Sequence, residues 1–277
     1  MFRKLAVGLT AAVALTACAS AAPGPKPIKI LIVSGGGYHN YANQRVILET
    51  GLKARLNADI THTFYDMKPD EDQTKPKLPI YGNPDYAEGY DLVIHDECAA
   101  DIKDEETVKG VLKPHADGIP AVALHCAMHS YRVGDHTKKA KEGDKGALWF
   151  EFLGLQSSRH GAQKPIEIEF KDKRHPVTKG ASDWTTGNEE LYNNVNVFDS
   201  SHTLATGKQD GEKEAVVVWT NLYGDKKTRV FSTTIGHNNA TVEDPRYLDL
   251  VAKGALWATD KMDANGRPKP GYGRPKK

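Results

Sequence analysis

The sequence has almost no excess of charge of either sign. Its 37 lysines and arginines face 36 aspartates and glutamates, which gives a formal net charge of +1. Without the first seventeen residues, which include Arg3 and Lys4, the count becomes 35 against 36. Such a balance gives no long-range attraction to nucleic acid or to an anionic bilayer. No basic stripe with interleaved aromatic residues occurs either, so we expect no nucleic-acid partner.

The motifs that most directly identify a chemistry are also missing. Ser34–Gly37 is glycine-rich and follows an apolar run, but it lacks the spacing of G-x-G-x-x-G and the lysine of a Walker loop. We interpret it as a turn that lets the backbone approach a ligand closely. The H-E-x-x-H pattern of metalloproteases is absent, and the chain contains no internal repeat.

The apolar run near the N-terminus, Leu5–Ala17, is too short to cross a bilayer as a helix. Two basic residues precede it, so we expect residues 1–21 to be an export signal. Leu15–Cys18 resembles a bacterial lipobox, in which Cys18 is lipidated and becomes the new N-terminus. An A-x-A sequence offers the second route, with cleavage after Ala21. We favour the lipobox and expect an exported bacterial protein, either periplasmic or held at the outer membrane as a lipoprotein with a lipid anchor.

The hydrophobic content, 39% of 277 residues, is sufficient for one large domain, which we expect over residues 28–260. A tail rich in proline, glycine and lysine, residues 262–277, is expected to be disordered. Patterns of apolar residues predict strands at 28–33, 60–65, 90–95, 119–124, 166–170, 215–219 and 228–235, and helices at 41–56, 101–113, 147–153 and 245–259. Alternation of strands and helices predicts a doubly wound α/β fold with a mainly parallel sheet.

Four of these strands end in polar residues. His39 follows the first strand, His95–Cys98 the third, His125–His129 the fourth and His237 the last. In a parallel sheet the carboxyl ends of the strands meet at one edge, where doubly wound proteins bind their ligands. We therefore place the functional site at this edge.

Cys98 and Cys126 are the only cysteines beyond the N-terminal signal. An oxidising compartment would permit a disulfide between them. Their pairing stays open, because the sequence does not place their Cα atoms within bridging distance.

The segment Gly118–Ala127 resembles the strand and nucleophile turn of class I glutamine amidotransferases: Gly-Ile-Pro, four small or apolar residues, then Cys. Here His125 occupies the nucleophile position and Cys126 comes one residue later. The downstream His-Pro-Glu of those enzymes is missing, because the only His-Pro continues with Val177. The resemblance implies a flavodoxin-like three-layer sandwich with sheet order 2-1-3-4-5, extra strands from the second half and no functional glutamine amidotransferase activity. Cys126 as a displaced nucleophile remains an alternative.

Eight short motifs in order are similar to those of the ThuA-like, or trehalose utilisation, family. They are Gly36–His39, Tyr90–Val93, Gly118–Pro120 with Leu124–His125, Trp149–Gly154, His175–Gly180, Glu189–Tyr192, Arg229–Phe231 with Gly236–Asn238, and Gly254–Ala258. The sequence departs from the family pattern at Glu189, where Asp is common, and at Asn238, where Asp often follows the late histidine. The second change removes a charge that would orient His237 or hold a metal ion.

The resemblance implies a small carbohydrate ligand, a disaccharide or its 3-keto derivative, because the family is linked to trehalose use alongside dehydrogenases that form 3-keto sugars. A keto sugar has acidic protons beside its carbonyl, which a histidine or glutamate can abstract. We assign Glu97 or His125 as the base, with His39 and His237 polarising the carbonyl in an isomerase, lyase or hydrolase. The side chains expected to bind the sugar are those of Tyr38, Asp96, His129, Glu190, Tyr192 and Asn238.

Two other interpretations of the same residues stay open. His39, His125 and His237 are candidate ligands of a divalent metal ion, which would make the protein a metal-dependent hydrolase. Alternatively, the protein is a non-catalytic exported sugar-binding protein. The many titratable groups favour an enzyme.

Overall fold

The computed structural model describes residues 24–274. The predictions of a signal peptide and of lipidation at Cys18 concern residues 1–23, which lie outside this range. Among residues 24–274, no helix has both the length and the apolar character needed to cross a membrane.

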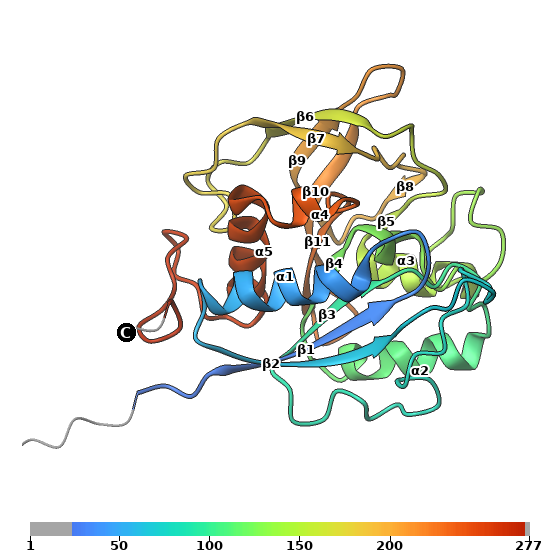
Figure 1. Ribbon diagram of the computed structural model, residues 1–277, viewed down its shortest axis with the longest axis horizontal. Helices are drawn as coiled ribbons and strands as arrows, with labels where there is room; N and C mark the ends of the chain where they lie inside the picture. The colour runs from blue at the N-terminus through green and yellow to red at the C-terminus, as the bar shows by residue number, and fades with distance from the viewer. Residues whose placement is uncertain (1–23, 275–277) are drawn as a thin grey trace, which may run out of the picture.

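The fold is built on a nine-stranded sheet with the order β2-β1-β3-β4-β11-β10-β9-β6-β7 (Figure 1). The strands are β1 (Ile28–Gly35), β2 (Ala58–Tyr65), β3 (Leu92–Glu97), β4 (Ala121–Leu124), β6 (Lys164–Phe170), β7 (Trp184–Glu189), β9 (Ser201–Lys208), β10 (Ala215–Tyr223) and β11 (Thr228–Thr233). The first five strands in this order are parallel, and the other four continue the sheet in antiparallel fashion. Strands β5 (Leu155–Gln156) and β8 (Asn196–Val197) form a separate antiparallel pair.

Helices cover both faces of the parallel part of the sheet (Figure 1). The α-helices are α1 (Tyr41–Lys53), α2 (Glu105–Ala116), α3 (Leu148–Leu153), α4 (Asn239–Val242) and α5 (Pro245–Ala258), and the short 3-10 helices are η1 (His125–His129) and η2 (Lys145–Ala147). Helices α1 and α5 share one hydrophobic core, while α2 and α3 share the other. The prediction of an α/β sandwich with a mainly parallel centre is confirmed, with β11 in the fifth position of the expected order.

The central strands are apolar on both faces because both faces are covered. Ile30 and Ile32 of β1 point into the core beneath α1 and α5, whereas Leu31 and Val33 point into the core beneath α2 and α3. In β6, by contrast, buried and exposed residues alternate. This strand lies in the antiparallel extension, where one face of the sheet is exposed.

The structure corrects two expectations about the second half. Strands β7 and β9 were not predicted, because the sequence Trp184–Glu189 contains a glycine and no apolar alternation, and Ser201–Lys208 is similarly polar. The tail is ordered through residue 274 rather than disordered. Met262 is buried, and Gly273 pairs with Leu56 as an isolated antiparallel bridge.

Candidate functional site

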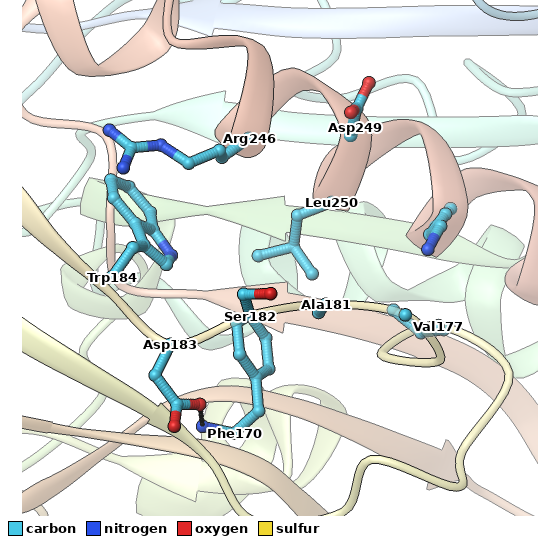
Figure 2. A pocket seen from close by; sticks show the side chains of 11 residues that line it. Phe170, Val177, Ala181, Ser182, Asp183, Trp184, Arg246, Asp249 and Leu250 are labelled. Atoms are coloured by element: carbon cyan, nitrogen blue, oxygen red, sulfur yellow. Dashed lines mark hydrogen bonds between the residues drawn. The ribbon is translucent and has the colours of Figure 1, made fainter.

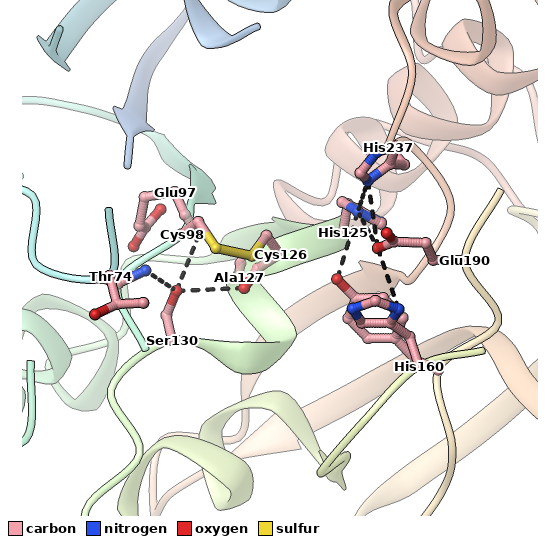
Figure 3. Close-up of a disulfide and its surroundings, with 12 residues drawn as sticks. Thr74, Glu97, Cys98, His125, Cys126, Ala127, Ser130, His160, Glu190 and His237 are labelled. Carbon is pink, nitrogen blue, oxygen red and sulfur yellow. Dashed lines mark hydrogen bonds and ion pairs between the residues drawn. A yellow bond between two sulfur atoms is a disulfide. The ribbon is translucent and has the colours of Figure 1, made fainter. Parts of the chain in front are cut away.

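Three histidines from three parallel strands meet at the carboxyl edge of the sheet. His39 follows β1, His125 follows β4 and His237 follows β11. We call these three residues the imidazole cluster. Glu190, which directly follows β7, brings a carboxylate to it from the antiparallel extension. Figure 3 shows Glu190 with His125 and His237 on one side and His160 on the other.

His125 occupies a strained backbone position. Its φ of 41° lies in the left-handed region, which costs a residue with a Cβ roughly 1–3 kcal/mol. The strain arises where β4 turns directly into η1, as at the nucleophile turn of an α/β enzyme. Its Nδ1–H donates to the carbonyl oxygen of Thr234 over 2.7 Å, so the lone pair of the neutral ring is on Nε2.

The polar atoms of the site are closely spaced. His125 Nε2 lies 3.3 Å from His237 Nδ1 and 3.6 Å from Glu190 Oε2, and His237 Nδ1 lies 3.3 Å from the same oxygen. The ring of His39 is nearly perpendicular to those of His125 and His237, with centroids 4.8 and 4.6 Å away. The hydroxyl of Tyr192 lies 3.4 Å from His125 Nε2.

The loop that carries His237 is fixed by the buried carboxylate of Glu189. This carboxylate accepts the backbone N–H groups of Gly236, His237 and Asn238, at 3.4, 3.0 and 3.3 Å. The side-chain amide of Gln44 in α1 donates to the carbonyl oxygen of His237 over 2.9 Å. Glu189 therefore has a positioning role, while its neighbour Glu190 faces the imidazole cluster.

The charges in the site depend on burial and on Glu190. Burial, together with the neighbouring His125 and His237, lowers the pKa of His39 to about 2, so this imidazole is neutral. Burial also lowers the pKa of His237, but the Glu190 carboxylate raises it more, and the result lies above 6.5. Burial raises the pKa of Glu190, but the imidazoles of His125 and His237 lower it by more. The net pKa is below the usual value, and the carboxyl group is ionised. The site thus holds one carboxylate among imidazoles.

A pocket of about 480 Å³ opens beside the cluster. Of the predicted residues, its lining includes Tyr38, His39, His129, Glu190, Tyr192 and His237. An adjoining hollow of about 620 Å³ shares some of these residues and adds Asn238. Most of the predicted site residues therefore border connected space, with His125 buried behind them at 2% exposure.

Three polar lining residues were not predicted: Arg132, His160 and Gln163. His160 and Gln163 lie in the segment between α3 and β6, which has no apolar period. Their signal in the sequence was only the polar character of that segment. His160 stacks on Tyr192, with ring centroids 5.4 Å apart and planes 25° apart.

Glu97 does not lie with the imidazole cluster, which corrects its assignment as the base. Its carboxylate is fully buried and accepts hydrogen bonds from His95 Nδ1 at 2.8 Å and from the Tyr131 hydroxyl at 2.9 Å. His95 in turn lies 3.0 Å from His115, a residue of α2. Glu97 shares a face of β3 with Val93 and His95, so its side chain points into the core beneath α2 and α3. Asp96 points to the opposite face, is also buried and lines neither space.

Cys98 and Cys126 are joined by a disulfide, with Cα atoms 5.0 Å apart. The bond connects the segment after β3 to η1, and both cysteines contribute to the pocket wall (Figure 3). Neither sulfur is a free thiol in this state, so the structure does not support Cys126 as a displaced nucleophile.

A second pocket, of about 400 Å³, lies between β7 and α5 (Figure 2). Its lining includes Phe170, Trp184 and Leu250, and the guanidinium of Arg246 lies 4.3 Å from the centre of the Trp184 ring. None of the predicted site residues borders it. Because its lining contains no histidine, whereas several histidines meet at the carboxyl edge of the sheet, the chemistry is assigned to that edge.

The imidazole cluster is also the place where the described residues could hold a metal ion. One ring nitrogen from each of its histidines lies within 4.8 Å of the others. The second group with this spacing, His39 with the two cysteines, has both sulfurs bound in the disulfide.

Comparison with known proteins identifies relatives of the whole domain. The family described as ThuA, trehalose utilisation, matches residues 29–258. A ThuA-like protein of Parabacteroides merdae has 22% identity and a TM-score of 0.65, covering 84% of this chain and 90% of its own. A ThuA-like protein of Bacteroides uniformis has 15% identity and a TM-score of 0.60, covering 90% and 98%. A Thermoplasma acidophilum protein described as part of a GMP synthase has 13% identity and a TM-score of 0.50, covering 85% and 96%.

These structural likenesses concern the fold, since all three identities are low. Among curated protein sequences, none matches the chain significantly.

Proposed function

Because the chain belongs to the ThuA family of trehalose utilisation, we propose that its histidine-lined pocket acts on a carbohydrate, a disaccharide or its 3-keto derivative, by acid/base chemistry. The observation that carries the proposal is the grouping of one carboxylate and several imidazoles around a pocket of about 480 Å³. A purely passive sugar site would require neutral donors and aromatic platforms, whereas this lining is dominated by titratable groups.

The reaction that suits these groups begins with removal of a proton from the carbon beside the sugar carbonyl. The electron pair of the C–H bond forms the enolate. Return of a proton to the same carbon from the opposite face completes an epimerisation, and return to the former carbonyl carbon, as the neighbouring hydroxyl loses its proton and becomes the new carbonyl, completes an isomerisation. A base near neutral pKa is the most effective, and imidazole is the usual one. Elimination of the second sugar from the enolate is the corresponding lyase reaction.

His160 is the best placed base. Its Nδ1–H donates to the carbonyl oxygen of Gly161 over 2.9 Å, so the lone pair of the neutral ring is on Nε2. Its side chain is 41% exposed at the pocket wall, and stacking on Tyr192 fixes the ring. His125 and Glu97 were the predicted bases, but His125 is buried behind the pocket and Glu97 lies in the core.

The enolate oxygen needs positive charge or hydrogen-bond donors close to it. The imidazoles of His39 and His237 and the guanidinium of Arg132 border the same pocket as His160. Tyr38, His129 and Tyr192 supply donors and an aromatic surface for the sugar hydroxyls and ring.

The test is exchange of solvent deuterium into a 3-keto glucoside, followed by NMR. We expect exchange with the unaltered protein and a decrease of about 10²–10⁴-fold with His160→Gln, the range for loss of a general base. His202→Gln is the matched control, because His202 lies on β9, outside the lining of the pocket, and contacts Asp172 on the surface.

Two other outcomes would contradict the proposal. Equal exchange rates for His160→Gln and the unaltered protein would remove His160 as the base. Saturable sugar binding with no exchange would favour the non-catalytic sugar-binding protein instead.

A further inference from the structure

The distances between Glu190 and the imidazole cluster are longer than those of charge-assisted hydrogen bonds. Charge-assisted hydrogen bonds between nitrogen and a carboxylate oxygen are about 2.7–2.9 Å long. Here Glu190 Oε2 lies 3.3 Å from His237 Nδ1 and 3.6 Å from His125 Nε2, and the two nitrogens are 3.3 Å apart. The two nitrogens and the carboxylate oxygen form a nearly equilateral triangle in which no side is as short as a charge-assisted hydrogen bond.

The same triangle matches one face of a metal coordination tetrahedron. Zinc binds histidine nitrogen and carboxylate oxygen at about 2.0–2.2 Å, so two ligands at the tetrahedral angle are roughly 3.3–3.6 Å apart. All three sides of the triangle fall in this range. His39 is the candidate for a fourth ligand, because one of its nitrogens lies within 4.8 Å of those of His125 and His237, although this limit is wider than the sides of the triangle.

The orientation of the rings supports the same conclusion. His125 is fixed with its Nε2 lone pair toward the cluster by the bond from Nδ1–H to Thr234. His39 Nδ1 is buried and has no hydrogen-bond partner among the described residues, which is costly for a polar atom unless a ligand satisfies it.

His237 has an outer partner whose amide can supply the acceptor that metal-binding histidines use. Its Nε2 lies 2.8 Å from the side-chain amide nitrogen of Gln163. A half-turn of that amide places its oxygen there instead, so that Nε2–H donates to it and the Nδ1 lone pair faces Glu190. The orientation of such an amide is assigned from its partners, and an ion bound at Nδ1 would require this second orientation.

We propose that the three imidazoles of the cluster and the carboxylate of Glu190 bind one zinc ion. Three neutral nitrogen ligands and one carboxylate leave the site with a net charge of +1, which attracts an oxygen of the substrate as a further ligand. A metal site formed by His39 and the two cysteine sulfurs is excluded in this state, because Cys98 and Cys126 are bonded to each other.

The role of the ion rests on the proposed function. An ion in the cluster would border the same pocket as His160, whose Nδ1 lies 3.7 Å from Glu190 Oε2, and would stabilise the negative charge on the carbonyl oxygen as the proton leaves. Glu190 then acts as a ligand, and the proton is moved by His160.

The test uses the full chain without a histidine tag, stripped with a chelator and titrated with zinc and then with cobalt(II). We expect one equivalent of either ion, an increase in Tm when the ion is added, and the strong visible absorption of tetrahedral cobalt. Glu190→Gln and His237→Gln should lose this binding. His202→Gln, a surface histidine outside the cluster, should keep it.

A variant outside the ligand set guards against loss of folding. Gln163 is exposed, and Gln163→Leu removes only the outer partner of His237, so zinc affinity should decrease by about 10–100-fold in a folded protein. Circular dichroism would confirm the fold of each variant. Failure of the unaltered protein to bind zinc, or equal binding by Glu190→Gln, would overturn the inference.

The two proposals can fail separately. Stoichiometric zinc without deuterium exchange would leave the metal site standing and remove the keto-sugar reaction. Exchange that persists in metal-free protein would leave the reaction standing and remove the role of the ion.

Discussion

The disulfide between Cys98 and Cys126 should make a large and measurable contribution to stability. It closes a loop with a sequence separation of 28 residues. In the chain-entropy description, closing a loop of this length in the unfolded chain contributes about 3.6 kcal/mol at 25 °C. For a domain of this size, 1 kcal/mol changes Tm by about 2–4 °C, so reduction should lower Tm by roughly 7–14 °C.

The assay is calorimetric unfolding of the unaltered protein with and without a reductant, beside the double variant Cys98→Ala/Cys126→Ala. The variant should unfold at or below the temperature of the reduced protein, because it also loses two buried sulfur atoms. Its Tm should not respond to the reductant, which controls for effects of the reductant elsewhere.

The reasoning would be refuted by a decrease in Tm of less than about 2 °C on full reduction, since this corresponds to under about 1 kcal/mol. A decrease of equal size in the double variant on addition of reductant would show that the effect does not come from this bond.

Two further predictions concern acid stability and the N-terminus. Burial, and then the neighbouring His95, lower the pKa of His115 to about 3, so between pH 6.5 and 3 the unfolded chain binds a proton there that the folded chain does not. On acidification, this group should lower the free energy of unfolding by up to about 1.4 kcal/mol per pH unit. A plot of Tm against pH should therefore have a shallower slope for His115→Leu than for the unaltered protein. An unchanged slope would contradict this. Mass spectrometry of the mature protein should find a lipidated Cys18 at the N-terminus, and a chain that begins at residue 22 would instead support ordinary cleavage after Ala21.

The parallel centre of the fold was predictable because its sequence signals are local. Strands buried on both faces are mainly apolar, as in β1, where only Lys29 is exposed, and β1 is followed by a helix with apolar spacing. The antiparallel extension has weaker patterns. Strand β7 contains Gly187 and few apolar residues, and the register of its pairing with β6 shifts between Pro165 and Glu167.

The site was predictable to the extent that parallel strand ends must meet. This rule brought His39, His125 and His237 together correctly, because each follows a strand of the parallel part. It failed for Glu97, since a residue inside the strand points to a face of the sheet rather than beyond its edge. His160 escaped prediction because it lies in a segment with no regular element, whose path depends on tertiary contacts alone.

The two ends of the described chain are held together at the side of the sheet that lies away from the pocket. The amide of Asn57 donates to the carbonyl oxygen of Pro25 at 3.3 Å and to that of Gly271 at 3.0 Å, and Figure 1 shows both ends on the same side of the molecule. Strand β1 then runs eight residues, about 25 Å, from this side to the histidines. A tether attached ahead of Pro25 would therefore hold the domain at the side opposite the pocket, and the pocket would open away from the point of attachment.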